Sequence, residues 1–209
     1  MQPTILGIIG KPLAGKDTQA DLFVTHHPEA IKISTGHIIR AVREEGETHR
    51  FWPIIGQYVG MMEQGIKLPD EPIMEMISRV IEEQIAEGKQ FIIIAGSPRS
   101  LHQLDGFRNV AKDTGAVLEM VHIGATDEET YRRSATRNEG RIDDTPEIHA
   151  IRLQEYNDYV IPMLTQLRTE GAVTEVDGMQ AKEVVYGQIE SVVRRHMDPE
   201  LCLPAMARR

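Results

Sequence analysis

The sequence predicts an α/β protein in which a five-stranded parallel sheet is covered by helices on both faces. Three observations predict it. Short apolar segments rich in β-branched residues recur along the chain, segments with helical spacing separate them, and a glycine-rich loop follows the first of them. Strands that alternate with helices form parallel sheets, because right-handed crossovers place the helices on the two faces. Ligands of such sheets bind beyond the carboxyl ends of the strands.

The expected elements follow the chain in order. The strands are short apolar segments that end at glycine, serine or a turn, and they are expected at 4–10 (TILGIIG), 30–34 (AIKIS), 91–99 (FIIIAGSPR, interrupted by Gly-Ser-Pro), 116–125 (AVLEMVHIGA) and 172–178 (AVTEVDG). Apolar residues at helical spacing predict a helix at 16–27 and further helices at about 70–87, 101–113, 127–137, 146–169 and 179–196.

The composition fits one folded domain and excludes several classes of protein. The 209 residues give room for one sizeable domain, expected at 1–197, and a tail at 198–209. Acidic residues outnumber basic ones by 32 to 23, and the net charge of −9 opposes broad binding to nucleic acid or to anionic membranes. The single Cys202 excludes an internal disulfide and a thiolate zinc site. Because no transmembrane or signal-peptide pattern is present and one cysteine fits a reducing compartment, we expect a cytoplasmic protein. We also expect a monomer.

A glycine-rich loop with a lysine follows the first expected strand. Gly10, Gly15 and Lys16 have the Gly-x4-Gly-Lys spacing of a phosphate-binding loop (P-loop), and a helical pattern comes next. The backbone N–H groups of such a loop and the positive end of its helix converge on phosphate oxygens, and the lysine adds a charge. We therefore expect a nucleotide's phosphates at this loop, on Gly10, Ala14, Gly15, Lys16, Asp17 and Thr18.

Two residues depart from the usual loop. Leu13 stands where a third glycine is common, and Asp17 follows the lysine where serine, threonine or glycine is usual. A carboxylate is favourable at a helix N-terminus, so Asp17 can be a capping residue. It would repel phosphates unless a cation lay between them. The sequence leaves two interpretations of Asp17 open, namely capping and contact with Mg²⁺, directly or through water.

Three further segments identify a family that the chain resembles. They are STGHIIR (34–40), GIKLPDE (65–71) and GSPRSLHQLDGF (96–107). Their order and spacing resemble the nucleoside monophosphate kinases, most closely the adenylate kinases, which typically read S-T-G-D-x-x-R, G-x-x-V-P-D and D-G-F-P-R-x-x-x-Q at these places. The likeness runs from about Ile5 to Ile189. It implies the P-loop NTPase type of fold, with ATP and AMP as substrates and Mg²⁺ arriving with ATP.

The resemblance also implies the acceptor site. Arg40 and Arg99 match the pair that grips the monophosphate, for which two guanidinium forks are well suited. Gln103 stands where the adenylate kinases have glutamine, whose amide can pair with adenine as donor and acceptor together. The residues implied at AMP are Thr35, Arg40, Leu68, Gly96, Arg99 and Gln103.

The second half of the chain resembles the lid of that family. The segment 131–156 has the order R-x3-R, G-R-x-D-D and R-x-x-x-Y, which implies a lid with Arg133, Arg137, Arg141, Asp143 and Asp144 and a further arginine, Arg152, at the transferred phosphoryl group. The catalytic residues implied are Lys16, Arg99, Arg133, Arg141 and Arg152. The resemblance divides the domain into a core, an acceptor-binding insertion at about 35–69 and a short lid at about 133–145, which carries no zinc.

Three substitutions leave rival interpretations open. Ala95 and His37 replace two aspartates of the family's magnesium surroundings, and Leu13 replaces a glycine. One rival is a nucleotide-binding protein that has kept the fold and lost strong catalysis, and another is a kinase of a different monophosphate or small acceptor. The arginine set favours an active monophosphate kinase, because a protein that only binds ATP has no need of Arg40, Arg99 and the lid arginines together.

Overall fold

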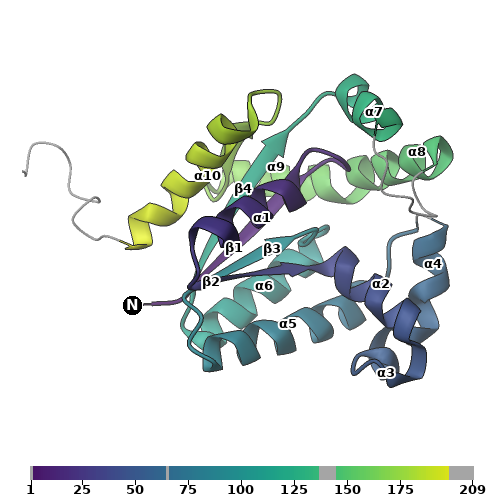
Figure 1. The fold of residues 1–209 in the computed structure, drawn as a ribbon, viewed down its shortest axis with the longest axis horizontal. Helices are drawn as coiled ribbons and strands as arrows, with labels where there is room; N and C mark the ends of the chain where they lie inside the picture. Colours follow the sequence, from purple (N-terminus) through teal and green to yellow (C-terminus); the bar gives the residue numbers. More distant parts are fainter. Residues whose placement is uncertain (1, 65, 137–144, 198–209) are drawn as a thin grey trace, which may run out of the picture.

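The computed structural model describes residues 2–64, 66–136 and 145–197 (Figure 1). Its centre is a five-stranded parallel sheet with the strand order β2-β3-β1-β4-β5. The strands are β1 (Thr4–Gly10), β2 (Ala30–Ser34), β3 (Phe91–Ala95), β4 (Val117–Gly124) and β5 (Thr174–Asp177). The predicted fold class and all five predicted strands are confirmed.

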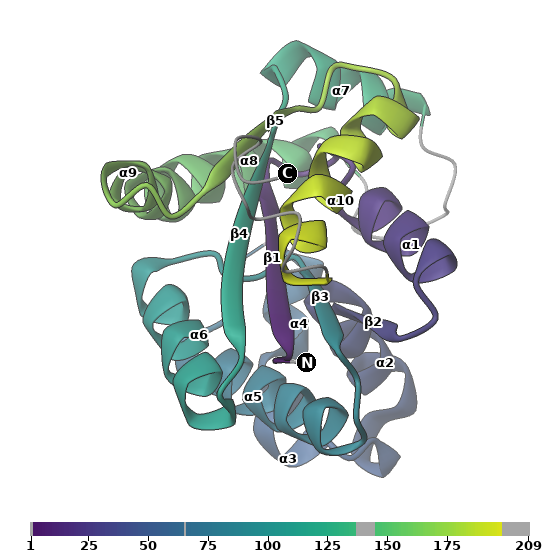
Figure 2. The same cartoon turned by 90° about the vertical axis from the view of Figure 1, so that its left-hand side faces the viewer.

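Helices cover both faces of the sheet (Figure 2). One face carries α1 (Lys16–His26) and α10 (Lys182–Met197), and the other carries α5 (Asp70–Ala86), α6 (Leu101–Thr114) and α9 (Ile161–Thr169). The alternation of β1 explains this division: Leu6 and Ile8 pack with the α1 and α10 side, whereas Ile5 and Ile9 pack with the α5, α6 and α9 side. All four side chains are at most 2% exposed, so β1 forms the centre of the core.

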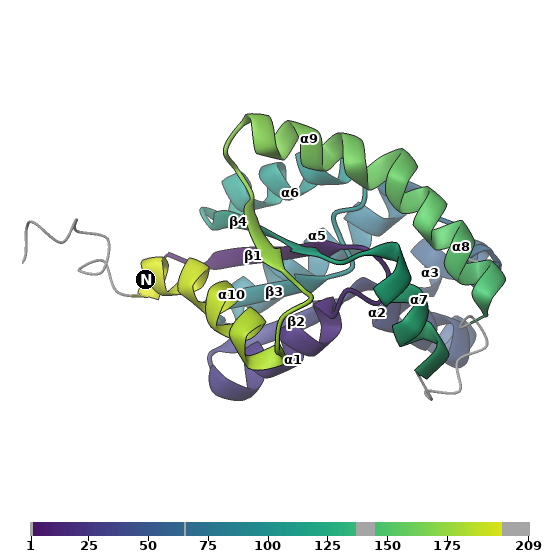
Figure 3. The ribbon, with the colours of Figure 1, turned by 90° about the horizontal axis from the view of Figure 1, so that it is seen from above.

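The remaining helices lie toward one end of the sheet. The segment between β2 and α5 folds into α2 (Thr35–Glu45), α3 (Trp52–Ile55) and α4 (Val59–Glu63), with short 3₁₀ turns η1 (Gly46–Thr48) and η2 (Gly56–Tyr58). After β4 come α7 (Asp127–Thr136) and α8 (Pro146–Glu155). A π-helical turn, η3 (Tyr156–Val160), joins α8 to α9, so that the three form one long curved helix (Figure 3). None of the helices in these described ranges combines the length and the apolar character that a membrane span requires.

The element boundaries agree with the prediction to within a few residues, and two differences have a physical cause. β3 ends at Ala95 rather than at 99, because Gly96 turns the chain with a φ of 93°, a left-handed value that favours glycine. The last helix begins at Lys182 rather than at 179, because Asp177 Oδ1 accepts a hydrogen bond from the Met179 N–H at 2.9 Å and forms a turn first. The β1, β2 and β3 strands all deliver their carboxyl ends to the same edge, where the phosphate loop, Ser34 and the Gly96 turn meet.

Candidate active site

The phosphate loop connects β1 to α1 and folds around its own lysine. Lys16 Nζ donates to the carbonyl oxygens of Gly10 at 2.9 Å and Lys11 at 2.7 Å. A Cβ atom at Gly10 would lie 2.7 Å from the Ile123 carbonyl oxygen, so this position requires glycine. Leu13 has a φ of 63°, a left-handed conformation that costs a residue with a Cβ about 1–2 kcal/mol. The loop therefore holds Leu13 in a strained conformation where a glycine would be relaxed.

Two adjoining pockets open at this edge of the sheet. Pocket A extends from the loop past α2 and the β3–α6 turn to α8, and pocket B extends from the loop toward α10. Pocket A is lined by all six residues implied at AMP, namely Thr35, Arg40, Leu68, Gly96, Arg99 and Gln103. Pocket B is lined by most of the residues expected at the donor phosphates, namely Ala14, Gly15, Lys16, Asp17 and Thr18, while Gly10 lines pocket A.

The two pockets share one wall. It consists of Leu13, Lys16, Asp17, Ser34 and Arg40, each of which lines both pockets. We call these five residues the shared wall. Lys16 and Arg40 place two positive charges on it and Asp17 places one negative charge, so the boundary between the two pockets keeps a net positive charge.

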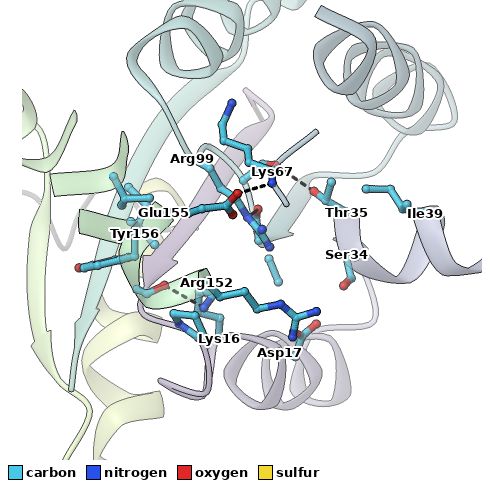
Figure 4. Close-up of a pocket in the computed structure, with 18 of the residues that line it drawn as sticks. Lys16, Asp17, Ser34, Thr35, Ile39, Lys67, Arg99, Arg152, Glu155 and Tyr156 are labelled. Carbon is cyan, nitrogen blue, oxygen red and sulfur yellow. Dashed lines mark hydrogen bonds between the residues drawn. The ribbon is translucent and has the colours of Figure 1, made fainter. Parts of the chain in front are cut away.

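Arg99 and Arg152 point into pocket A from two sides (Figure 4). Arg99 Nε donates to the Gly96 carbonyl oxygen at 2.6 Å, which leaves the fork of Nη1 and Nη2 as the part of the group that can bind a phosphate. Loss of hydration and the like charge of Arg152 lower the pKa of Arg99, while Glu155 and Asp17 raise it. An arginine remains charged under these conditions, so the pocket keeps its positive charge.

Arg133 lies at the edge of pocket B, where it ties three segments together. Its Nη1 donates to the Leu13 carbonyl oxygen at 3.1 Å, its Nη2 to the Gly178 carbonyl oxygen at 2.9 Å, and its Nε to Glu129 at 2.7 Å. These contacts join α7 to the phosphate loop and to the β5–α10 turn. Four further residues of the expected lid lie outside the described residues: Arg137, Arg141, Asp143 and Asp144.

Asp17 faces β2. The N-cap of α1 is Gly15, without a side-chain capping hydrogen bond, and the Asp17 carboxylate lies 3.0 Å from Lys32 Nζ. Burial alone would raise the pKa of Asp17, but Lys32, a hydrogen bond from Ser34 and the charge of Lys16 outweigh it and place the pKa below its ordinary value. The carboxylate is therefore ionised at neutral pH, on the shared wall and beside the phosphate loop.

The two substituted aspartate positions also lie at the pockets. Ala95 ends β3, is 1% exposed and lines pocket A, whereas His37 lies on the first turn of α2 and lines pocket B. Neither side chain can supply a carboxylate. Asp17 therefore provides at the pockets a carboxylate that Ala95 and His37 do not provide.

The sequence reasoning missed two charged residues at the site, Glu155 and Lys32. Glu155 lines pocket A and accepts a hydrogen bond from the Lys67 N–H, and burial raises its pKa even though Lys67, Arg99 and Arg152 act in the opposite direction. Its place three residues after Arg152 on one helix face is the signal that could have found it. Lys32 bridges Asp17 and Asp21, at 3.0 and 2.9 Å, and no local pattern in β2 indicates this.

With a phosphate loop on one side of the shared wall and paired arginines on the other, the fold and site define a P-loop kinase, which moves a phosphoryl group between two bound anions. The family model described as "Adenylate kinase" matches residues 8–172. An adenylate kinase of Phenylobacterium zucineum is 32% identical over 190 residues, which cover 89% of this chain and 95% of that protein. The chain belongs to the adenylate kinase family.

The chain is similar to further adenylate kinases from other bacteria. An adenylate kinase of a Caulobacter species is 30% identical over 190 residues, covering 89% of this chain and 96% of that protein. An adenylate kinase of Thermus thermophilus is 31% identical over 188 residues, covering 88% of this chain and 94% of that protein. The likeness thus extends over nearly the whole length of these relatives, so the chain is a nucleoside monophosphate kinase.

Proposed function

We propose that this protein catalyses the reversible transfer of a phosphoryl group from MgATP to AMP, which gives two ADP. The observation that carries the proposal is the shared wall, because Leu13, Lys16, Asp17, Ser34 and Arg40 line both pockets. A donor whose phosphates lie in pocket B and an acceptor in pocket A meet end to end at this wall, in the geometry that transfer requires. The names and extent of the relatives favour this activity over a nucleotide-binding protein without catalysis.

Each side chain contributes charge and position, because phosphoryl transfer needs no protein nucleophile. Lys16 leaves the carbonyl oxygens of its own loop and follows the transferred phosphate. Arg40 and Arg99 hold the phosphate of AMP, and the amide of Gln103 pairs with its base. Arg152 approaches from α8 and stabilises the negative charge that develops between the two substrates.

We also propose that the domain at 1–197 consists of a core, an acceptor-binding insertion at about 35–69 and a short lid at about 133–145. Residues 198–209 follow it as a tail. Arg133 stands at the base of this lid, and closure would bring Arg137 and Arg141 to the phosphates, with Asp143 and Asp144 in the same segment. A closed lid would keep water from the phosphoryl group.

The residues at the pockets fit Mg²⁺ that is held mainly by the phosphates of ATP. In such sites Mg²⁺ keeps several waters and meets one or two carboxylates. Asp17 supplies one carboxylate on the shared wall, and the part of the chain that the structure describes contains no group of three or more His, Cys, Asp or Glu side chains that could hold a metal by itself. We propose that Asp17 would orient a water of the ion, which would supply positive charge to offset the negative charge of the ATP phosphates.

Asp17→Asn tests this role. The change keeps the shape of the side chain and removes its charge, so we expect a lower kcat and a Mg²⁺ requirement that rises about tenfold to a hundredfold, the usual effect of losing an outer-shell partner. Thermal stability should change by at most about 1 kcal/mol, because the ion pair with Lys32 is partly exposed. The measurement is the rate as a function of free Mg²⁺ at constant ATP.

Asp21→Asn is the matched control, since Asp21 pairs with the same Lys32 at 2.9 Å from one turn further along α1 and lines pocket B without belonging to the shared wall. Its magnesium titration should resemble that of the unchanged protein. An Asp17→Asn variant with an unchanged magnesium titration and a lower melting temperature would mean that Asp17 is only a structural partner of Lys32.

A coupled assay of ADP formation tests the function itself. We expect turnover of AMP with MgATP, and much slower turnover of CMP, UMP and GMP in parallel reactions. A molecule that joins two adenosines through five phosphates should bind tightly and inhibit. It spans both pockets, and one molecule loses translational and rotational entropy on binding where two separate substrates would each lose it. Turnover of another monophosphate, together with failure to bind this molecule, would contradict AMP as the acceptor.

A further inference from the structure

The amide of Gln103 is held at both ends. The Arg99 N–H donates to Gln103 Oε1 at 2.8 Å, and Gln103 Nε2 donates to Asp70 Oδ1 at 2.7 Å. A backbone N–H can only donate and an ionised carboxylate can only accept, so these partners decide which end of the amide is oxygen and which is nitrogen. Gln103 lines pocket A and is 2% exposed, so the protein rather than bulk water sets the orientation.

The start of α6 fixes the oxygen end. Ser100 is the N-cap, and its Oγ accepts a hydrogen bond from the Gln103 N–H at 3.2 Å. The Gln103 side chain reaches back past the cap to the N–H of Arg99, which is a variant of the reciprocal capping box Ser-x-x-Gln. The same short segment thus begins the helix and directs Oε1 toward the backbone.

Asp70 fixes the nitrogen end from a different element, the first turn of α5. Its Oδ1 also forms an ion pair with the Lys67 ammonium, and its Oδ2 accepts a hydrogen bond from Ser100 Oγ at 2.7 Å. Burial would raise the pKa of Asp70, but the hydrogen bonds from Lys67, Ser100 and Gln103 outweigh it and place the pKa below its ordinary value. Asp70 is therefore an ionised acceptor at neutral pH, and it is itself held in place.

A fixed amide offers a base one donor and one acceptor in a fixed order. Oε1 keeps a second lone pair and Nε2 a second N–H, and these form the edge available to a ligand in pocket A. Adenine presents an N–H donor at its 6-amino group and an acceptor at N1. Hypoxanthine and guanine present the reverse, an acceptor at O6 and a donor at N1. One orientation of the amide therefore fits 6-aminopurines, and the opposite orientation fits 6-oxopurines.

We infer that Asp70 is a positioning residue that sets the base specificity of the acceptor site: by holding Gln103 Nε2 it keeps the amide in the orientation that accepts a 6-aminopurine monophosphate and rejects a 6-oxopurine one. The inference rests on the proposed function, in which Gln103 faces the base of the acceptor. Turning the amide over would break the hydrogen bonds to Asp70 and to the Arg99 N–H, and would set donor against donor at Arg99. The charged bond to Asp70 alone accounts for a preference of about tenfold to a hundredfold between the two orientations.

The test compares AMP with IMP, two nucleotides that differ only at the edge in question. We measure kcat/KM for each with MgATP as donor, and take the ratio of the AMP value to the IMP value. Asp70→Leu removes the acceptor and should lower this ratio about tenfold or more. Asp70→Asn keeps a neutral acceptor but is an amide that can turn together with Gln103, so it should lower the ratio about threefold to tenfold.

Glu71→Gln is the matched control. Glu71 is exposed in the same first turn of α5, so its loss removes the same charge from the helix end without touching Gln103, and the ratio should stay unchanged. A merely structural role of Asp70 would lower kcat/KM for AMP and IMP alike; an unchanged ratio in either folded Asp70 variant therefore overturns the inference. If Asp70→Leu fails to fold, Asp70→Asn decides by the same criterion. Absence of turnover of AMP by the unchanged protein would instead contradict the proposed function.

Discussion

Replacing Lys16 by methionine is expected to lower kcat about a hundredfold to a thousandfold, the usual loss when one preorganised cationic or hydrogen-bonding group is removed from a transition state. Lys16 is the only lysine on the shared wall of Leu13, Lys16, Asp17, Ser34 and Arg40, so both pockets lose the charge at the point where the phosphates meet. Methionine keeps most of the length of the side chain. The measurement is kcat with saturating AMP and MgATP, together with the melting temperature.

Lys11→Met is the matched control for this prediction. Lys11 belongs to the same loop, but its ammonium pairs with Asp127 at 2.6 Å and lines neither pocket. Its loss should change kcat by less than about threefold, in keeping with the small contribution of partly exposed ion pairs. Equal losses in the two variants would mean that the loop needs positive charge in general, and that Lys16 has no special place at the phosphates.

The fold followed from the sequence because local and long-range signals agree. The segment FIIIA (91–95) is apolar at every position and all five residues are buried, as expected of a strand covered on both faces. The phosphate loop follows β1 directly, and the rule that ligands bind at the carboxyl ends of strands then places it beside the Gly96 turn. Arg40, Arg99 and Gln103 meet in one pocket for this reason.

The contacts that the sequence could not give join residues far apart in the chain. Lys32 reaches Asp17 because α1 packs beside β2, yet in the segment AIKIS it reads only as the polar residue between Ile31 and Ile33. Asp70 and Gln103 are 33 positions apart, and each has a sufficient local explanation, one as a first-turn acidic residue and the other as half of a capping box. The motifs therefore predicted several of the residues that line the pockets, but not how these residues hold one another.

The capping interpretation of Asp17 shows the same limit. A helix N-terminus favours an acidic residue through its dipole, so the position alone explains Asp17 without any partner. The structure instead directs the carboxylate toward Lys32, with Ser34 as a second partner. Asp17 lies in the first turn of α1 but also on the shared wall, where the proposed function places a cation beside it.

Arg99→Lys is expected to lower kcat/KM for AMP about tenfold to a thousandfold, equivalent to about 1.4–4 kcal/mol of transition-state stabilisation. The change keeps the positive charge but removes the planar fork. Arg99 Nε already donates to the Gly96 carbonyl oxygen at 2.6 Å, which orients Nη1 and Nη2 as a pair. A lysine ammonium cannot contact that carbonyl and bind the phosphate as a planar fork at the same time, because its charge is concentrated at one point on a flexible chain.

In Arg99→Lys the kinetic loss should concern AMP, the phosphate acceptor, and not ATP, the phosphate donor. Arg99 lines pocket A and not pocket B, so the affinity for ATP should change by less than about twofold, in contrast to Lys16→Met, which affects both pockets. Arg108→Lys is the matched control, on the helix α6 that follows Arg99, since Arg108 contacts Asp105 and Glu170 on the surface and should tolerate the change. Steady-state kinetics with AMP varied and ATP saturating, then the reverse, separate the two substrates. Unchanged turnover in Arg99→Lys would mean that Arg99 does not hold the phosphate, because an ordinary surface arginine exchanges for lysine without such a loss.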